Sequence, residues 1–531
     1  MIQRSTICLI ATAILYALFR FWGLTDSCIW FDEIFSVHAA TLPWNEVVPF
    51  AAKDLIHPPA FYLLLKFWIL AFGESLIWLR ILPVVLSVLA LFPLWMLCRE
   101  LKLQKPTVVA AFTLFAVNGA LIKYAQEVRM YSLLLFLAIV SIWLFSRYFF
   151  RGKSFWMLVL TNAILVNTHY FGWFVVVSQV LAILIFQRIK ILRTLLMLAL
   201  TAVAFVPWVY ALLRFSEPGS SVMQNIGWMK PPKLRALVEF AFDLVDPFYF
   251  QQSSVDAGAN YLIAVPLLLL FVAAVITFAT QIKDQATKER FYFLAVLAAA
   301  PVVLVFFLSW LMPLSIWGSR HLLIVFPPVL LLFAICVTEL KPAVIRNIAV
   351  AAAGILIMAA FVIYVRTEAA NQIWCAWEGL AKEWIVAPQD STKPKNLYVF
   401  EDLVAYHYWY ATRGLPNYSV HLVKEIEGVR NDPAYFLPRG FDGVKVTDIN
   451  GIANDEIWIS FRGPARASKQ GTAFIDDGFD TRFEVPVTNF ENLGYSVEDV
   501  KRETIGTQTA YIIRMKKARQ SNRADEFVIA N

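Results

Sequence analysis

Two adjacent acidic residues, Asp32 and Glu33, stand in the stretch WFDEIFSVHAA, a few positions after the first long apolar run of the chain. A carboxylate can take a proton from a reacting hydroxyl as a general base, which contributes about 10²- to 10⁴-fold to a rate. Neighbouring side chains on a helix point about 100° apart, so the two acids cannot face one reacting atom together. We therefore expect one chemical and one supporting role, rather than the paired carboxylates of a glycosidase. The structural alternative is that both acids only complement the dipole at a helix N-terminus.

Other polar residues occur where long apolar segments end, and they include cations, imidazoles and a further acid. Such cations suit a lipid phosphate that carries a sugar, because its leaving group needs positive charge, whereas the attacking hydroxyl needs a base. Each residue also has a structural explanation, as an interfacial ion pair, a side chain that snorkels to the membrane surface or a hydrogen-bond donor to a loop carbonyl. The candidate substrate-binding residues are His57, Lys123, Gln126, Glu127, Arg129, His169, Tyr170 and Arg320.

The composition is that of a polytopic α-helical membrane protein. Of the 531 residues, 59% are hydrophobic and 16% are charged. The mean hydropathy is +0.62, which is too apolar for a soluble protein of this size. Residues 1–365 contain 26 Lys and Arg against 16 Asp and Glu, whereas residues 366–531 contain 20 against 23. The positive excess therefore belongs to membrane topology, and no nucleic acid is expected as a partner.

Eleven segments are apolar and long enough to be candidate membrane-spanning helices. Clusters of Lys and Arg fall in alternate short loops between them, which places those loops in the cytoplasm. The opposite loops then face outside together with everything after 366, and they are 23–75, 123–129, 168–170, 214–259 and 313–320. The eleven segments are 5–22, 76–98, 106–122, 130–147, 154–168, 170–187, 194–213, 260–281, 291–312, 321–339 and 346–365.

The apolar stretch 57–73 is not counted as a span, because counting it would place every later basic cluster on the wrong side of the membrane. Its Lys66, its aromatic residues and its start at Pro58 and Pro59 favour a helix in the membrane interface. The outer loop 214–259 contains an amphipathic stretch, which is expected either to cover a donor, to admit an acceptor or to pack at the interface.

We expect two domains, a transmembrane module at 1–365 and a small extracytoplasmic α/β domain at 366–531, where the long apolar runs stop. Strands are expected at 396–402, 456–463, 495–502 and 509–517. The five cysteines have no CxxC or CxxH spacing, so neither a zinc site nor a disulfide framework is indicated and they look incidental. The sequence leaves open whether Cys28 and Cys375 pair.

Six motifs in this order carry a family resemblance: IWFDEIFSV, HPPAFYLLLKFW, QEVRMYSLLLF, THYFG, GWMKPPKL and SRHLLIVFPPVLLL. Together they resemble the GT-C membrane glycosyltransferases, in particular the bacterial branch similar to dolichyl-phosphate-mannose protein mannosyltransferases of glycosyltransferase family 39. The likeness covers roughly residues 1–365 and is weak in the tail. It implies a GT-C fold with about eleven transmembrane helices, interfacial helices and a small C-terminal α/β domain.

The resemblance also implies an inverting transferase in the cytoplasmic (inner) membrane. This enzyme would move a sugar from a polyprenyl-phosphate donor to an extracytoplasmic glycan, lipid or protein acceptor. Asp32 matches the catalytic carboxylate of the family, Glu33 its partner, and Glu127 a position where members often have another acid. Arg129, Arg320 and Lys123 are the candidates for the donor phosphate. Members differ in metal dependence, so no cofactor is assigned; His57, His169 and Glu127 are the residues that would hold a divalent ion.

Two other classes of protein remain as alternatives. A polytopic lipid or glycan transporter or flippase would place its polar residues near the midplane of the membrane, on broken helices and often in repeated halves. A scaffold with an outer binding domain would leave the acids structural, so Asp32→Asn would keep its function. The sequence decides neither the sugar nor the acceptor.

Overall fold

The computed structural model describes residues 4–227, 229–248, 257–367, 372–387, 394–424, 437–464, 487–505 and 508–517. The chain folds as two compact units, each with its own set of internal contacts. The first consists of Met1–Ser27 and Phe35–Ala370, and the second of Cys28–Ile34 and Asn371–Asn531. A short piece of the N-terminal region therefore belongs to the same unit as the C-terminal domain.

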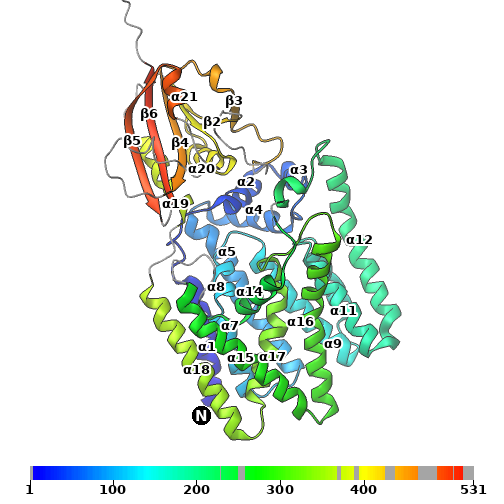
Figure 1. The fold of residues 1–531 in the computed structure, drawn as a ribbon. Helices are drawn as coiled ribbons and strands as arrows, with labels where there is room; N and C mark the ends of the chain where they lie inside the picture. The colour runs from blue at the N-terminus through cyan, green and yellow to red at the C-terminus, as the bar shows by residue number, and fades with distance from the viewer. Residues whose placement is uncertain are drawn as a thin grey trace, which may run out of the picture. The chain divides into compact units, whose positions relative to one another are not determined.

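The first unit is helical throughout the part that the structure describes (Figure 1). Its helices before the long outer loop are α1 (Arg4–Phe21), α2 (Phe31–Thr41), which begins in the second unit, α3 (Trp44–Asp54), α4 (Ala60–Phe72), α5 (Leu76–Leu89), α6 (Leu91–Glu100), α7 (Lys105–Val117), α8 (Gly119–Ala125), α9 (Tyr131–Arg151), α10 (Phe155–Val166), α11 (Gly172–Phe186), η1 (Arg188–Lys190) and α12 (Ile191–Phe215). The later ones are α13 (Met223–Ile226), α14 (Leu234–Val245), α15 (Ala257–Gln281), α16 (Gln285–Leu311), η2 (His321–Val325), α17 (Phe326–Thr338) and α18 (Ala343–Arg366).

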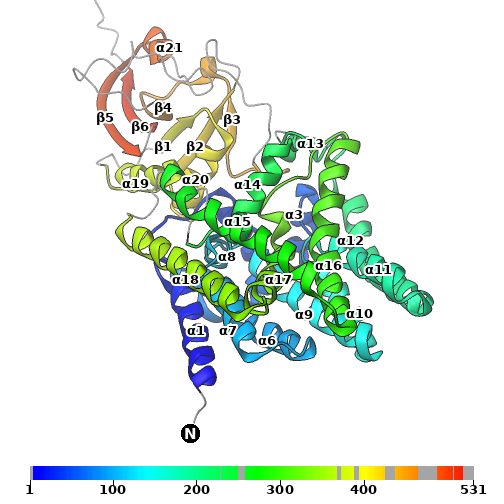
Figure 2. The ribbon, with the colours of Figure 1, turned by 60° about the horizontal axis from the view of Figure 1, so that its bottom comes forward.

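Each of the eleven predicted membrane segments coincides with one of these helices or with a broken pair of them. Within the described residues, seven helical segments are long and apolar enough to cross a membrane, and shorter apolar helices include α1, α7, α10 and α11. α10 packs against α12, and α11 lies beside both of them (Figure 2). Packing of this kind leaves apolar side chains on the outside, where lipid would cover them.

Helix α4 occupies the stretch that was predicted to lie in the membrane interface. One of its faces is buried, with Phe61, Tyr62 and Leu65, whereas Phe67 and Leu70 on the other face are exposed. Lys66, which suggested a position at the membrane surface, is buried: its ammonium donates to the carbonyls of Ala40 and Leu42 at the end of α2. The charge of Lys66 is therefore explained by a contact inside the protein.

The helices α7 and α8 are separated at Asn118, and this residue binds part of the loop 214–259. The side chain of Asn118 caps α8 by accepting from the N–H of Leu121 at 3.0 Å. Its amide donates to the carbonyls of Asp243 and Leu244 at 3.1 and 3.3 Å. The amphipathic stretch predicted in this loop forms α14, which buries Phe240 and Asp243 and is thereby fixed to the break.

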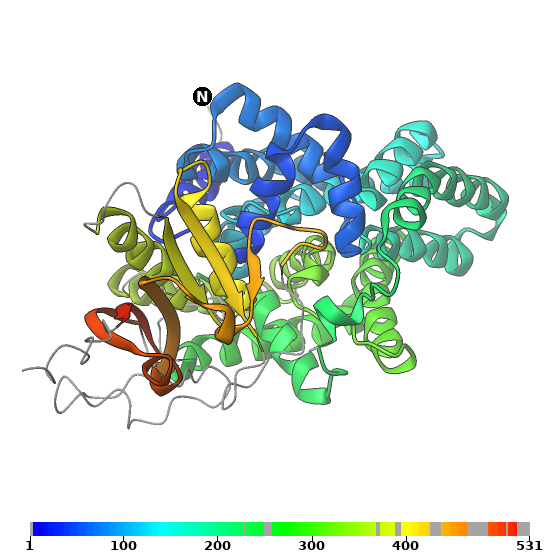
Figure 3. The ribbon, with the colours of Figure 1, turned by 90° about the horizontal axis from the view of Figure 1, so that it is seen from above.

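The second unit contains a six-stranded sheet of order β3-β2-β1-β4-β6-β5, which is visible from orange β3 to red β5 and β6 in Figure 3. β1, β2, β3 and β4 are parallel, and β4, β6 and β5 are antiparallel. The four predicted strands correspond to β1 (Lys395–Val399), β4 (Glu456–Pro464), β5 (Tyr495–Ile505) and β6 (Gln508–Lys517); β2 (Tyr418–Val423) and β3 (Lys445–Thr447) were not predicted. The accompanying helices are α19 (Ile373–Val386), α20 (Asp402–Thr412), η3 (Ile449–Gly451) and α21 (Val487–Asn492).

Candidate active site

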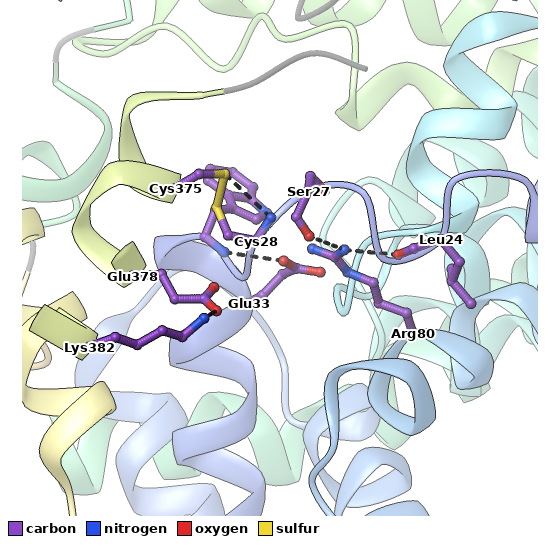
Figure 4. The surroundings of a disulfide bond; sticks show 9 residues. Leu24, Ser27, Cys28, Glu33, Arg80, Cys375, Glu378 and Lys382 are labelled. Atoms are coloured by element: carbon purple, nitrogen blue, oxygen red, sulfur yellow. Dashed lines mark hydrogen bonds and ion pairs between the residues drawn. A yellow bond between two sulfur atoms is a disulfide. The ribbon is translucent and has the colours of Figure 1, made fainter. Parts of the chain in front are cut away.

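The two adjacent acids occupy the first turn of α2 and have different surroundings. Asp32 is half-buried, whereas Glu33 is completely buried. Glu33 Oε2 accepts a hydrogen bond from the backbone N–H of Trp30 at 3.2 Å (Figure 4). This is the return contact of a capping box, in which the third helical residue satisfies the N–H of the residue before the helix. Of the two acids, only Asp32 is partly exposed.

Cys28 and Cys375 form a disulfide bond, with their Cα atoms 5.2 Å apart (Figure 4). The prediction that the cysteines are incidental is therefore wrong for these two. It failed because the partners are 347 residues apart and no local spacing indicates the bond. Among the other cysteines, Cys8 is exposed and Cys98 and Cys336 are buried as free thiols.

Two buried cations of the first unit satisfy carbonyls on either side of the acidic turn. The guanidinium of Arg80 donates to the carbonyls of Leu24 and Ser27 at 2.9 and 2.7 Å, immediately before Cys28 (Figure 4). Lys66 donates to the C-terminal end of α2, and its ammonium also lies 4.9 Å from the ring centre of Trp44. The backbone on both sides of the acids is thereby hydrogen-bonded to buried charged donors.

Arg129 lies at the centre of a buried polar cluster in the first unit. One of its guanidinium nitrogens donates to Oγ of Ser36, on α2, at 3.2 Å. Another lies 3.4 Å from Nδ1 of His57, in the loop between α3 and α4. All three residues are buried, so the positive charge of Arg129 is held in a region that is largely closed to water.

Two more imidazoles extend this cluster. The rings of His57 and His169 are 5.2 Å apart, and those of His169 and His321 are 5.4 Å apart. Nδ1 of His169 accepts from the N–H of Phe171 at 3.0 Å, so its ring proton belongs on Nε2. Nε2 of His169 and Nδ1 of His321 are buried and have no hydrogen-bond partner among the described residues. The group Ser36, His57, Arg129, His169 and His321 is called the Arg129 cluster below.

The electrostatics of the cluster keep its imidazoles neutral. Burial lowers the pKa of His57 well below the ordinary value, and the charge of Arg129 lowers it further. Burial, together with the charges of Arg129 and Arg320, lowers the pKa of His169 to about 3. A buried N–H on a neutral imidazole beside a fixed guanidinium can donate to an anion that enters the site.

Comparison with known proteins was made at the level of families, curated proteins and solved structures. No family model and no curated protein matches the chain. The crystal structure of ArnT from Cupriavidus metallidurans, bound to undecaprenyl phosphate, superposes with a TM-score of 0.58 over 96% of this chain and 97% of that one, at 10% sequence identity. The chain has the fold of the GT-C glycosyltransferases. This fold confirms the fold class expected from the sequence, and the long apolar helices make the protein an integral membrane protein.

Two other solved structures match a smaller part of the chain, with lower TM-scores. The archaeal oligosaccharyltransferase AglB from Archaeoglobus fulgidus, in complex with an inhibitory peptide and a dolichol-phosphate, matches at 12% identity with a TM-score of 0.45. That match covers 77% of this chain, which spans 63% of the length of AglB. The S. cerevisiae Pmt1-Pmt2 complex bound to its sugar donor matches at 14% identity, over 43% of this chain and 36% of that one, with a TM-score of 0.33.

Two predicted site residues, Gln126 and Tyr170, have structural partners within the first unit. The side-chain amide of Gln126 donates to the carbonyls of Arg20 and Trp22 at 3.1 and 2.7 Å, at the end of α1. The hydroxyl of Tyr170 donates to the carbonyl of Leu55 at 3.3 Å and accepts from the indole of Trp208 at 3.1 Å. These contacts join helices and loops, which was the structural explanation for such residues.

The remaining predicted residues are the charged Lys123, Glu127 and Arg320. Lys123 and Glu127 form an ion pair of 3.2 Å within one turn, and Glu127 is the more buried partner. Arg320 stands before η2 and is half-buried. It lies close enough for its charge to lower the pKa of His57 and of His169.

The residues proposed for a divalent ion do not fit one. Among the described residues, no group of three or more His, Cys, Asp and Glu side chains is placed to hold a metal. His57 and His169 lie beside Arg129, whose positive charge opposes a cation there, and Glu127 is paired with Lys123. We therefore derive no step through a metal.

Sequence reasoning missed two members of the cluster. Ser36 was not singled out, although it follows Asp32 by four residues and so lies on the same face of α2. His321, which lies within the motif SRHLLIVFPPVLLL, was not assigned to the site. Helical spacing from Asp32 could have indicated Ser36, whereas the meeting of three histidines from distant loops has no sequence signal.

Proposed function

We propose that this protein transfers a sugar from a polyprenyl-phosphate donor to a hydroxyl group of an extracytoplasmic acceptor. The observation that carries the proposal is the Arg129 cluster, a buried cation among neutral imidazoles in a chain with the GT-C fold. The solved ArnT structure with this fold contains undecaprenyl phosphate, which is a ligand of the same chemical class as the proposed donor. A buried guanidinium with a neighbouring N–H donor suits a lipid-linked phosphate.

The phosphate of the donor would bind to Arg129 and Arg320, with the Nε2–H of His169 as a third donor. Ser36 and His57 hold the Arg129 guanidinium in one orientation, so little reorganisation is needed when the anion arrives. Because the imidazoles are neutral, they supply hydrogen bonds and the arginines supply the charge. This division matches a leaving group that needs positive charge rather than a proton.

Asp32 would act as the general base. It precedes Ser36 by one turn of α2, so the carboxylate projects from the helix face that carries an Arg129 contact. The acceptor oxygen forms a bond to the anomeric carbon of the sugar, and the bond from that carbon to the phosphate oxygen breaks. The hydroxyl proton goes to Asp32 and the electron pair goes to the phosphate, which leaves as polyprenyl phosphate. Attack from the opposite side inverts the anomeric centre.

Glu33 would support this base without touching the substrate. Its buried carboxylate fixes the N–H of Trp30 and hence the geometry of the turn that begins α2. A base held in one position is more effective, because an error of about 1 Å in the placement of reacting groups can cost about 10²-fold in rate.

The reaction would take place on the extracytoplasmic side of the cytoplasmic membrane. Disulfides form and persist in oxidising compartments, and the Cys28–Cys375 bond lies at the acidic turn. The basic clusters in alternate loops give the same orientation. We accordingly take residues 1–365 as the catalytic module and residues 366–531 as an extracytoplasmic domain.

A panel of labelled polyprenyl-phosphate sugars, offered to the wild-type protein in proteoliposomes with crude envelope acceptors, tests the proposal. Consumption of one donor by the wild type, and much less by Arg129→Gln, is the expected result. If the wild type neither consumes nor binds any of the donors, the proposal is wrong, and a function as a transporter or as a scaffold is favoured instead.

A further inference from the structure

The acidic turn is structurally part of the C-terminal domain. Residues 28–34, which include Asp32 and Glu33, group with residues 371–531 and not with the helices that precede and follow them. A C-terminal domain that only bound an acceptor or a partner would not need this segment. The contacts that produce the grouping are therefore of interest for the reaction.

Helices α19 and α20 hold the segment by covalent, hydrogen-bonding and aromatic contacts. Cys28 is bonded to Cys375 on α19, and its backbone N–H also points at Sγ of Cys375 at 3.4 Å (Figure 4). The ring of Trp30 lies 6.0 Å from that of Trp374, on α19. The ring of Phe31 lies 5.2 Å from that of Tyr406, on α20.

These contacts act on the residues just before and within the first turn of α2. Cys28 is three residues before the start of the helix at Phe31. The hydrogen bond from the N–H of Trp30 to Glu33 closes the turn. Because the ring of Trp30 also packs against Trp374, α19 is linked through Trp30 to Glu33, the residue next to Asp32. A movement of Cys28 or Trp30 would be passed to the carboxylates by the backbone.

The far end of α2 is held independently. Lys66 satisfies the carbonyls of Ala40 and Leu42, and Ser36 accepts from Arg129. Loss of the disulfide would therefore loosen the attachment of the first turn to α19, while the rest of the helix and the Arg129 cluster stay in place. Such a change should affect the base and spare the phosphate site.

We infer that the C-terminal domain positions the proposed base, with Cys28 and Cys375 as positioning residues whose disulfide fixes the Trp30–Glu33 turn. This inference rests on the proposed function, because it assigns the turn its importance for transfer. The domain would thus be a part of the catalytic apparatus, whatever acceptor it meets.

The test compares wild type, Cys28→Ser, Cys375→Ser and the double variant in proteoliposomes. Cys8→Ser is the matched control, because Cys8 is an exposed free thiol. We expect the kcat of sugar transfer to fall at least tenfold in both single variants and no further in the double variant, because all three remove the same bond. The affinity for polyprenyl phosphate should stay within twofold of wild type. A double variant with the kcat of the wild type would overturn the inference.

Hydrogen exchange gives a readout that does not depend on activity. Amides 29–34 should exchange at least tenfold faster in the double variant, whereas amides 36–41, next to Ser36 and Lys66, should not change. If the variants fail to fold, the folded wild type is reduced with a phosphine instead. The phosphine is oxidised as the S–S bond becomes two thiols. Unchanged exchange at 29–34 would contradict the inference. If the wild type transfers no sugar, the proposed function fails, yet hydrogen exchange still decides whether the domain fixes the turn.

Discussion

The guanidinium of Arg129 lies 3.4 Å from Nδ1 of His57, and both side chains are buried. The imidazole has a lowered pKa and is neutral, so this hydrogen bond orients the guanidinium without cancelling its charge. A fixed and buried positive charge is a feature that a phosphate site requires and that a membrane helix otherwise avoids.

Replacement of Arg129 should weaken donor binding. Arg129→Gln removes a charged donor from a buried site, for which hydrogen bonds are worth about 1.5 to 3 kcal/mol, or about 10- to 150-fold in affinity. Arg129→Lys should recover only part of the loss, because an ammonium cannot reach Ser36 and His57 with the same planar geometry. Equilibrium binding of labelled polyprenyl phosphate measures both effects.

The control is Arg235→Gln. Arg235 is exposed and pairs with Glu239 one turn away on α14. Such surface pairs contribute little, so binding and transfer should stay close to wild type. Equal losses in Arg129→Gln and Arg235→Gln would show that any reduction of positive charge weakens binding and would remove the special role of Arg129.

Lys66→Met should destabilise the protein. The buried ammonium of Lys66 satisfies two carbonyls at the end of α2, and their loss leaves buried acceptors unpaired. The expected decrease in the free energy of unfolding is about 1.5 to 3 kcal/mol. Thermal unfolding in detergent measures it, with Lys53→Met as control, because Lys53 is partly exposed and its ion pair with Glu217 is 3.9 Å long. An unfolding temperature equal to that of the control would refute the capping role.

Asp246 should make stability depend on pH. Burial, followed by the negative charge of Asp243, raises the pKa of Asp246 to about 8. The folded state therefore holds a proton that the unfolded state releases near pH 4, and stability falls as the pH rises from about 4 through about 8. Asp246→Asn removes the free-energy cost of a buried ionised carboxylate. The gain in stability of this variant over wild type should therefore be larger at pH 9 than at pH 5.

Thermal unfolding of wild type and Asp246→Asn at the two pH values measures this difference. Asp284→Asn is the control, because Asp284 is exposed and caps α16 with a pKa lowered by hydrogen bonds from Thr287 and Ala286. Its carboxylate is ionised at both pH values, so the control should shift equally at each. A margin for Asp246→Asn that does not grow with pH would mean that this carboxylate is not held protonated.

Glu33 should tolerate Gln better than Ala. The amide oxygen of Gln can accept a hydrogen bond from the N–H of Trp30 as the carboxylate does. Ala would remove this acceptor and leave a cavity in a buried site. We expect Glu33→Gln to keep most of the transfer rate and Glu33→Ala to lose both rate and thermal stability. A large loss of kcat in a stable Glu33→Gln protein would show that the charge of Glu33 takes part in the reaction.

Much of the fold followed from runs of apolar residues. All eleven predicted spans coincide with helices because a long apolar run has few alternatives to a helix in a membrane. The strand β2 was missed although its sequence YSVHLV alternates between apolar and polar residues, as strands commonly do. The contacts of Lys66 were missed because one lysine in an apolar helix indicates a position at the membrane interface. The sequence does not show that the end of α2 lies beside it.

The candidate site was predictable in type but not in arrangement. The sequence indicated that Arg129, Arg320, His57 and His169 gather at the ends of helices, and in the structure they do. It did not indicate which of the polar residues only join helices, as Gln126 does, because that depends on the carbonyls they meet. The Cys28–Cys375 bond joins positions 347 residues apart and could be known only from the fold.

The central claim is that Asp32 removes the proton of the acceptor. Its most direct test is a comparison of wild type and Asp32→Asn in proteoliposomes, with donor binding and single-turnover transfer measured on the same samples. The account predicts that Asp32→Asn folds and binds the donor within about twofold of wild type, while its transfer rate falls by about 10²- to 10⁴-fold. Transfer at the rate of the wild type by folded Asp32→Asn would contradict it.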